Sequence, residues 1–258
     1  MHVKELLSLR NKVILVTGGA GNYGRCIVEG LAEADGTVVI ASRNLQACQD
    51  FAEKLKSQGL DVHALQLDQA NHQSVLDIKQ QLHDKFGGLD VFVNNAVARP
   101  TKGYFTSLES LEESLNVNGV GVFDLTREMT ELIAVRGGGV IINIASMMGM
   151  FGPDLSNYEG TDMGDIAPDY FFHRAGLINY TRYLARFLAN KHIRANCISP
   201  GGLFNYQNPR FLENYCKKVP VGRMANNDDI KGLVVFLASD ASAYVNGENI
   251  LMDGGMHA

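Results

Sequence analysis

The chain has 258 residues, of which 46% are hydrophobic and 20% are charged, a composition typical of a soluble globular enzyme. The net charge of −5 argues against nucleic-acid binding, which would need a basic patch. The first residues lack the apolar core of a signal peptide, and no apolar run is long enough to span a bilayer. We therefore expect a cytoplasmic protein that acts on a small molecule, with neither nucleic acid nor membrane as a partner.

The cysteines predict neither a disulfide framework nor a metal site. They are widely scattered, no C-x-x-C pair occurs, and no histidines have the spacing of metal ligands. We expect reduced structural thiols, as is usual in the cytoplasm, and no bound metal.

The first predicted strand, residues 13–16, leads into a glycine-rich turn and then into a helix over residues 25–34. Gly19, Gly21 and Gly24 fit the spacing G-x-G-x-x-G. Glycines there permit a tight turn and let backbone N–H groups approach a pyrophosphate, which the helix N-terminus also favours. The pattern predicts a dinucleotide-binding site; the alternative is a turn with a purely structural role.

Apolar runs then alternate with amphipathic segments of helical length. This alternation indicates right-handed β-α-β units, and hence a doubly wound, Rossmann-type α/β fold with a parallel sheet. No linker divides the chain, so we expect residues 1–258 to form a single domain, with the ligand at the carboxyl ends of the strands. Further strands are predicted at residues 37–41, 62–67, 89–93, 140–145, 193–198 and 249–252, and helices at residues 45–58, 74–86 and 177–189.

Residues 147–169 interrupt the alternation. The stretch is rich in glycine and proline and carries the carboxylates of Asp154, Glu159, Asp162, Asp165 and Asp169. Loops of this length are usually functional or disordered. Because this one follows a predicted central strand, we expect it to border the substrate. A second segment, with Leu203, Phe204, Tyr206 and Phe211, could form a mobile lid.

Taken in order, these motifs resemble those of the compact short-chain dehydrogenase/reductase family. Residues 17–24 look like its T-G-x-x-x-G-x-G turn, with Asn22 in place of the middle glycine. Asparagine can tolerate that place because it visits left-handed backbone conformations. The other similar segments are Asn94-Asn95-Ala96, with Val97 where the family has glycine, Asn118, Ser146, Ser199-Pro200-Gly201-Gly202, and residues 236–240 and 245–255.

The resemblance implies a bound nicotinamide dinucleotide. Ser42 stands where an acidic residue would bind the ribose of NAD, and Arg43 follows it; this pair suits a 2′-phosphate. We therefore favour NADP(H), while NAD remains possible. Arg43 could instead be a solvated surface charge, and Asp68, which resembles the adenine contact, a plain turn residue. The implied cofactor-binding residues are Gly18, Gly19, Gly21, Asn22, Tyr23, Gly24, Ser42, Arg43, Asp68, Asn95, Ala96, Pro200 and Gly201.

The family's catalytic pair, Tyr-x-x-x-Lys, is matched by Tyr170 and Arg174. Their spacing places both on one helix face, and a fixed positive charge beside a phenol lowers its pKa from about 10. Tyr158 is a rival, because its distance from Ser146 is closer to the usual one. We prefer Tyr170 because a helical pattern continues after it. By resemblance, Ser146 hydrogen-bonds the substrate oxygen, and Asn118 helps to hold a water.

Arg174 is the main departure from the family. Arginine supplies the charge and can bind a ribose hydroxyl, but it cannot give up its proton as lysine can. If the position acts only electrostatically, Arg174 can serve; if it must pass protons, activity should fall. The alternative is that Tyr170 is a core residue and Arg174 a surface charge.

The resemblance implies that the protein interconverts an alcohol and a carbonyl by hydride transfer. The acidic loop favours a sugar, sugar acid or polyol as the substrate. One alternative is a 3-oxoacyl-type or other carbonyl reductase. Another is a dinucleotide-binding sensor or scaffold that has lost catalysis, which the departures at Asn22, Val97 and Arg174 would explain. An epimerase of the extended kind ranks last. The family also implies a homo-oligomer, either a dimer or a tetramer.

Overall fold

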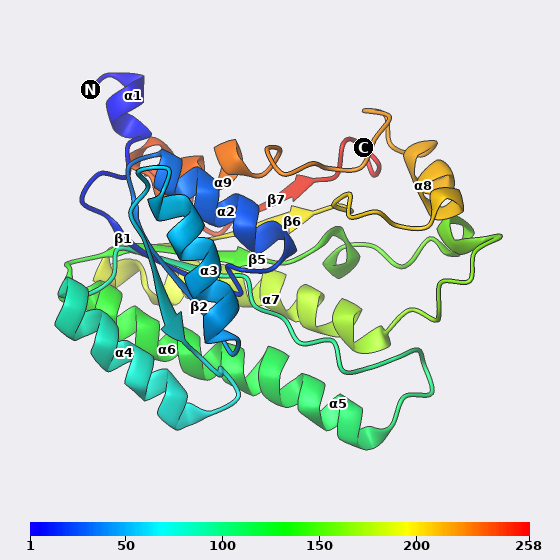
Figure 1. Cartoon of the computed structure of the whole chain (residues 1–258), viewed down its shortest axis with the longest axis horizontal. Helices are drawn as coiled ribbons and strands as arrows, with labels where there is room; N and C mark the ends of the chain where they lie inside the picture. The colour runs from blue at the N-terminus through cyan, green and yellow to red at the C-terminus, as the bar shows by residue number, and fades with distance from the viewer.

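A seven-stranded sheet, with every strand parallel to its neighbours, forms the centre of the molecule (Figure 1). The computed structural model describes residues 1–258, and its strand order is β3-β2-β1-β4-β5-β6-β7. The strands are β1 (Val13–Thr17), β2 (Thr37–Ser42), β3 (Val62–Gln66), β4 (Val91–Asn94), β5 (Gly139–Ile144), β6 (Ile193–Pro200) and β7 (Asn249–Met252). The prediction of a doubly wound, Rossmann-type α/β fold is confirmed.

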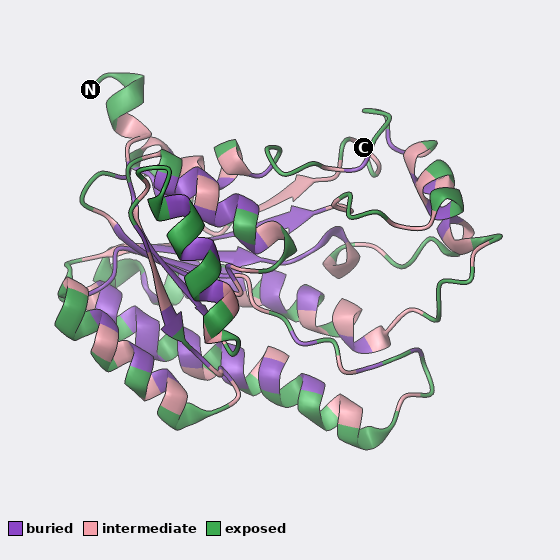
Figure 2. Ribbon diagram, viewed as in Figure 1, coloured by how far each residue is buried: buried purple, intermediate pink, exposed green.

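Helices cover both faces of the sheet and form two separate cores. On one face pack α2 (Asn22–Glu33), α3 (Leu45–Lys56) and α9 (Lys231–Ala238). On the other face pack α4 (His72–Phe86), α6 (Gly121–Val135) and α7 (Pro168–Phe187). The central strands β1, β4 and β5 are mostly apolar because both of their faces are buried, as the purple centre of Figure 2 shows, whereas the edge strands β3 and β7 are only partly buried.

The remaining helical segments are short. They are α1 (Val3–Leu6), α5 (Leu108–Leu115), α8 (Pro209–Cys216), the π-helical turn η1 (Asn116–Val120), and the 3-10 turns η2 (Met147–Gly149), η3 (Leu155–Tyr158), η4 (Ala189–Lys191) and η5 (Asp240–Ser242). In Figure 1, α5 and α8 lie on the right, on the side toward which β6 and β7 point.

The strand order reverses between β1 and β4, which are neighbours in the sheet. In doubly wound sheets this is where a ligand binds, beyond the carboxyl ends of the strands. Asn95, directly after β4, is hydrogen-bonded to the end of β1: its side-chain amide donates to the Thr17 carbonyl at 2.9 Å and to the Gly18 carbonyl at 3.2 Å. The end of β4 is therefore fixed to the glycine turn after β1.

Most element boundaries lie within three residues of the predicted ones, and only the start of α7 differs more. Strand β4 begins at Val91 rather than at residue 89, and the Asp90 carboxylate accepts from the Val13 N–H at 2.7 Å and pairs with Arg136. Helix α7 begins at Pro168, before the amphipathic pattern at residues 177–189, since proline favours the first turn.

The structure also bears on two bulk properties. All four cysteines are free thiols, and Cys26, Cys48 and Cys197 are buried, as expected of structural thiols. None of the helices has both the length and the apolar character needed to cross a membrane.

Candidate active site

A cavity of about 1000 Å3 lies at the carboxyl ends of strands β1 to β6. Of the residues predicted to form the site, all but Gly19 and Asn118 line it. Those that do are Gly18, Gly21, Asn22, Tyr23, Gly24, Ser42, Arg43, Asp68, Asn95, Ala96, Ser146, Tyr170, Arg174, Pro200 and Gly201. Segments far apart in the sequence thus meet in one cavity, as the resemblance implies.

The glycine turn has the close packing that a pyrophosphate cradle needs. A Cβ on Gly24 would lie 2.1 Å from the Gly18 oxygen, and one on Gly19 would lie 2.4 Å from Ile40, so neither position has room for a side chain. Gly19 therefore lies beneath the cavity and packs the turn against β2. No side chain caps the N-terminus of α2, where Gly21 is the N-cap residue. The turn fits an anionic ligand at this helix end.

The explanation given for Asn22 is wrong. Asn22 is the first residue of α2 and does not have the positive φ that the left-handed region requires. The left-handed residue of the turn is Gly18, with φ of 64°. Asn22 is tolerated because any residue can adopt ordinary helical geometry at a helix start.

Other predicted cofactor residues also hold the cavity together. The Tyr23 hydroxyl donates to the Gly201 carbonyl at 3.1 Å, which joins the glycine turn to the Pro200-Gly201 turn after β6. The Ala96 N–H donates to the Thr17 hydroxyl at 3.0 Å, beside the Asn95 contacts with β1. These bonds fix the walls of the cavity relative to one another.

At the end of β2, arginine rather than serine is free to meet a ligand. The Ser42 hydroxyl donates to the Asn44 carbonyl at 3.1 Å and lies 3.1 Å from Cys48 Sγ, so it is already engaged. Arg43 is exposed, lines the cavity and forms no ion pair. Asp68 lines the cavity and also acts as a turn residue, because its carboxylate accepts from the Ala70 N–H.

Tyr170 and Arg174 lie on one face of α7 and meet Ser146 at the end of β5. The Arg174 Cζ lies 4.9 Å from the centroid of the Tyr170 ring. Burial alone would raise the pKa of Tyr170, but the guanidiniums of Arg174 and Arg99, with hydrogen bonding to Ser146 and Arg174, outweigh it. The pKa of the phenol therefore lies below its ordinary value of 10.0. This is the electrostatic setting of an acid–base tyrosine.

Arg174 is buried, so the alternative of a surface charge is wrong: only 6% of the residue is exposed. Its Nη1 donates to the Ile144 carbonyl at 2.6 Å, which anchors the guanidinium to the end of β5. Its Nε is buried and has no hydrogen-bond partner in the protein. A buried N–H of this kind is costly unless a ligand satisfies it, and a ribose hydroxyl would do so.

Asn118 lies behind the cavity wall, in the π-helical turn η1. Its side chain clamps Ala98, accepting from the Ala98 N–H at 2.9 Å and donating to the Ala98 carbonyl at 2.9 Å. Single π-turns inside helices are frequent at functional sites. The side chain of Asn118 is thus committed to positioning the segment after β4.

A buried polar network beneath α7 was not predicted. The Asp169 carboxylate accepts from the hydroxyls of Thr101 and Ser114, and Ser114 lies 3.1 Å from His173 Nε2. Burial lowers the pKa of His173. The network connects the start of α7 to α5 and to the segment after β4. It therefore helps to fix the position of Tyr170 in the cavity. Only the proximity of Asp169 and His173 to Tyr170 in sequence could have suggested it.

Tyr158 has a different environment from Tyr170. It ends the turn η3, packs against Phe211 with ring centroids 5.1 Å apart, and has a pKa raised by burial. Phe211 is itself buried beside Tyr215 in this apolar cluster, whereas Phe204 and Tyr206 are exposed. Of Tyr158 and Tyr170, only Tyr170 lies on the helix that carries Arg174.

The acidic loop supplies fewer free carboxylates than its composition suggests. Asp154 pairs with Lys218 at 2.7 Å, Asp162 accepts from Asn208 at 3.2 Å, and Asp169 belongs to the buried network. Of the five carboxylates, only Asp165 and Asp169 line the cavity. The loop therefore does line the cavity, through Met147, Met148, Tyr158, residues 163–167 and Asp169, but most of its carboxylates do not.

Known proteins similar to this chain include dehydrogenases and reductases. Residues 19–257 match a family model described as Enoyl-(Acyl carrier protein) reductase. The 3-oxoacyl-(acyl-carrier-protein) reductase FabG of Aquifex aeolicus is 29% identical over 256 residues, which cover 97% of this chain and 99% of that protein.

Two solved structures share the whole architecture. A short chain dehydrogenase from Leptospira borgpetersenii with bound NAD+ is 32% identical, with a TM-score of 0.87, and the match covers 100% of this chain and 96% of that one. A gluconate 5-dehydrogenase from Burkholderia cenocepacia, in complex with NADP and tartrate, is 26% identical, with a TM-score of 0.88 and coverage of 99% and 98%. The chain belongs to the short-chain dehydrogenase/reductase family and is an oxidoreductase acting on CH–OH or carbonyl groups.

Proposed function

We propose that the protein uses NADP(H) to interconvert an alcohol and a carbonyl on a small polar molecule, with Tyr170 as the acid–base residue. One observation carries the proposal: a half-buried phenol with a lowered pKa lies in the same cavity as the glycine turn, beside the buried guanidinium of Arg174. A tyrosine of lowered pKa can take a proton from an alcohol or return one to a carbonyl near neutral pH.

The nicotinamide, when bound, supplies or accepts the hydride. Ser146 then holds the substrate oxygen, and the Tyr170 hydroxyl moves the proton at that oxygen. Arg174 stays charged throughout, because a guanidinium does not lose its proton in proteins. Its part is to stabilise the phenolate and, through its unpartnered Nε, to hold a cofactor hydroxyl. Asn118 keeps the segment after β4 in place.

The cofactor preference rests on the end of β2, where Arg43 is free and no carboxylate stands at Ser42. Thermal-shift titrations should show greater stabilisation by NADP than by NAD, because ligand binding stabilises the native state in proportion to occupancy. The Arg43→Ala variant should bind NADP about 10- to 100-fold more weakly, the loss expected for a charged hydrogen-bonded contact.

Affinity for NAD is the internal control, because NAD lacks the 2′-phosphate. The matched control variant is Lys56→Ala, which removes one exposed positive charge at the end of α3. Stronger stabilisation of the natural chain by NAD than by NADP would contradict the cofactor proposal.

A sugar, sugar acid or polyol remains the proposed substrate class, and the tartrate in the similar gluconate 5-dehydrogenase complex supports it. A carbonyl reductase of the 3-oxoacyl type is the second candidate. The apolar wall made by Met147, Met148, Tyr158, Phe211 and Met224 favours it. Turnover of a panel of sugar acids, polyols and acyl thioesters, followed through NADPH absorbance, separates the two. Activity on acyl thioesters alone would overturn the first.

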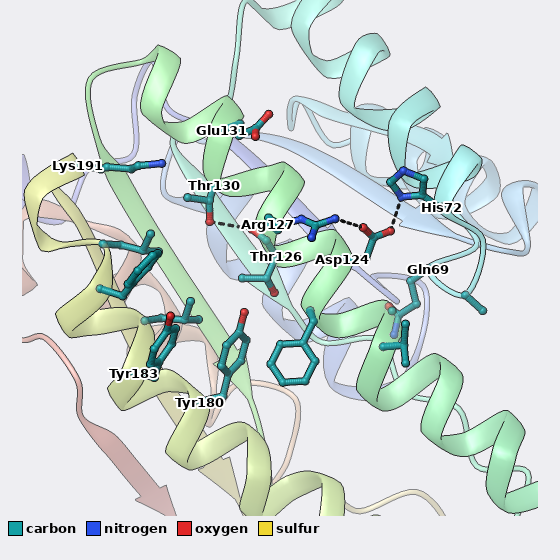
Figure 3. Close-up of a pocket in the computed structure, with 17 residues that line it drawn as sticks. Gln69, His72, Asp124, Thr126, Arg127, Thr130, Glu131, Tyr180, Tyr183 and Lys191 are labelled. Atoms are coloured by element: carbon teal, nitrogen blue, oxygen red, sulfur yellow. Dashed lines mark hydrogen bonds and ion pairs between the residues drawn. The ribbon is translucent and has the colours of Figure 1, made fainter.

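We also propose that the chain forms a homo-oligomer through the groove between α6 and α7, shown in Figure 3. This groove has a volume of about 980 Å3, and Tyr180, Tyr183 and Phe187 stack along its α7 side. Phe123, Tyr183 and Phe187 are exposed, and contiguous apolar surface of this kind marks protein interfaces.

Sedimentation should show the natural chain as a dimer or tetramer and the Phe187→Asp variant as a smaller species. Phe172→Asp is the control, an exposed aromatic on the same helix that does not line the groove. A monomeric natural chain would contradict the proposal.

A further inference from the structure

Arg99 is a cation at the cavity that the sequence did not single out. Its Cζ lies 4.5 Å from the centroid of the Tyr170 ring, closer than that of Arg174. The residue is exposed, lines the cavity and forms no ion pair or side-chain hydrogen bond within the protein. It is therefore a free guanidinium held against the proposed acid–base residue.

The backbone on either side of Arg99 is fixed. Asn118 clamps both polar groups of Ala98, and the Thr101 hydroxyl donates to buried Asp169 at the start of α7. Pro100 lies between, and its ring restricts the backbone further. Asn118 and Asp169 thus fix the backbone at Arg99, and both lie on elements that also position Tyr170. A fixed backbone reduces the conformational entropy that Arg99 loses when it binds a ligand.

The carboxylates nearest in the cavity do not neutralise this charge. Asp169 is occupied by two hydroxyl donors, and Asp165 lies against Gly103 without pairing with Arg99. A substrate whose oxygen sits at Tyr170 therefore meets an unpaired guanidinium that packs against the same phenol ring. The planar fork of arginine matches a carboxylate in two parallel hydrogen bonds.

We propose that Arg99 binds a carboxylate of the substrate, and that the preferred substrates are small hydroxy or keto acids in which this carboxylate lies near the reacting carbon. The inference rests on the proposed function and narrows it: acids are favoured over neutral sugars, polyols and acyl thioesters. Arg99 then acts twice, as the partner of the carboxylate and as a charge beside the phenol.

This double role has a measurable consequence. A carboxylate bound to Arg99 offsets one of the two cations that lower the pKa of Tyr170. The pKa of the phenol should therefore be higher in the complex with an acid than in the free enzyme. For oxidation, the pKa seen in kcat should exceed that seen in kcat/KM with a hydroxy acid, but not with its neutral ester.

The test combines binding and turnover in the natural chain, Arg99→Gln, Arg99→Lys and Lys102→Gln. Lys102 is an exposed cation nearby that does not line the cavity, so its loss is a matched control for net charge. Calorimetry of tartrate binding to the NADP-saturated protein should show a loss of about 10- to 100-fold in Arg99→Gln. Arg99→Lys should retain part of the affinity, and Lys102→Gln all of it.

Turnover of a hydroxy acid and its methyl ester should be compared on the alkaline plateau, where the phenol is ionised in every variant. Arg99→Gln should raise KM for the acid relative to the ester by a similar factor. Equal effects on acid and ester, or none, would overturn the role of Arg99 while leaving the proposed function intact. Failure of the natural chain to bind NADP or to turn over any substrate would instead overturn the proposed function.

Discussion

Replacing Tyr170 with phenylalanine is expected to lower kcat by about 100- to 10,000-fold, the usual contribution of a positioned acid–base group. Phenylalanine keeps the ring, so the packing of Arg99 and Arg174 against it is largely retained. Only the hydroxyl that exchanges a proton with the substrate is lost. Steady-state kinetics with NADP and the best substrate of the panel give the measurement, and NADP thermal shifts show whether the fold is kept.

Tyr158→Phe is the matched control for this substitution. Tyr158 lines the same cavity but packs on Phe211, and burial raises its pKa. Its hydroxyl should contribute little to kcat. A large loss in Tyr158→Phe with a small loss in Tyr170→Phe would reverse the assignment.

Removal of the Arg174 charge should produce the second large effect, expressed mainly through pH. Arg174 is the largest of the influences that lower the pKa of Tyr170, so Arg174→Gln should raise this pKa. Losing an opposite charge at this range disfavours the phenolate, so alcohol oxidation at neutral pH should fall by about 10- to 1,000-fold. Oxidation needs the phenolate, and its rate should therefore rise with pH at a higher midpoint than in the natural chain.

Arg174→Lys separates charge from shape. The natural side chain contacts the Tyr170 ring and donates to the Ile144 carbonyl at 2.6 Å, and a single ammonium cannot occupy both places. We expect a partial loss of turnover with a small shift in the pH profile. A large gain in turnover would show that arginine impairs the natural chain, which would favour a cofactor-binding sensor or scaffold.

The sequence predicts this fold well because hydrophobic burial determines it. Runs such as residues 13–16 and 140–142 are apolar on both faces because helices cover both sides of the sheet. The ends of strands are less predictable where a side chain, rather than a backbone carbonyl, accepts a hydrogen bond from the neighbouring strand. Asp90 is the example: its carboxylate binds Val13 and Arg136 before β4 begins. No pattern of hydrophobicity contains that contact.

The site is predictable as far as its motifs are local. The glycine turn, Ser146 and the pair Tyr170 and Arg174 are readable because spacing along one strand or helix fixes their geometry. Arg99 and the Asp169 network are not, because they arise from the packing of α5 and α7 against the segment after β4. For the same reason, the composition of the acidic loop does not predict which charges are free in the cavity, since it does not reveal which carboxylates bind other parts of the protein.

A crystal structure of the NADP complex tests whether the Tyr170 phenol is the group that exchanges a proton with the substrate. We expect the Tyr170 hydroxyl beside the nicotinamide ring, Arg174 Nε bound to a ribose hydroxyl, and Tyr158 still packed on Phe211. A structure with Tyr170 turned away from the ring, or with Tyr158 in its place, would rule out Tyr170 as the acid–base residue.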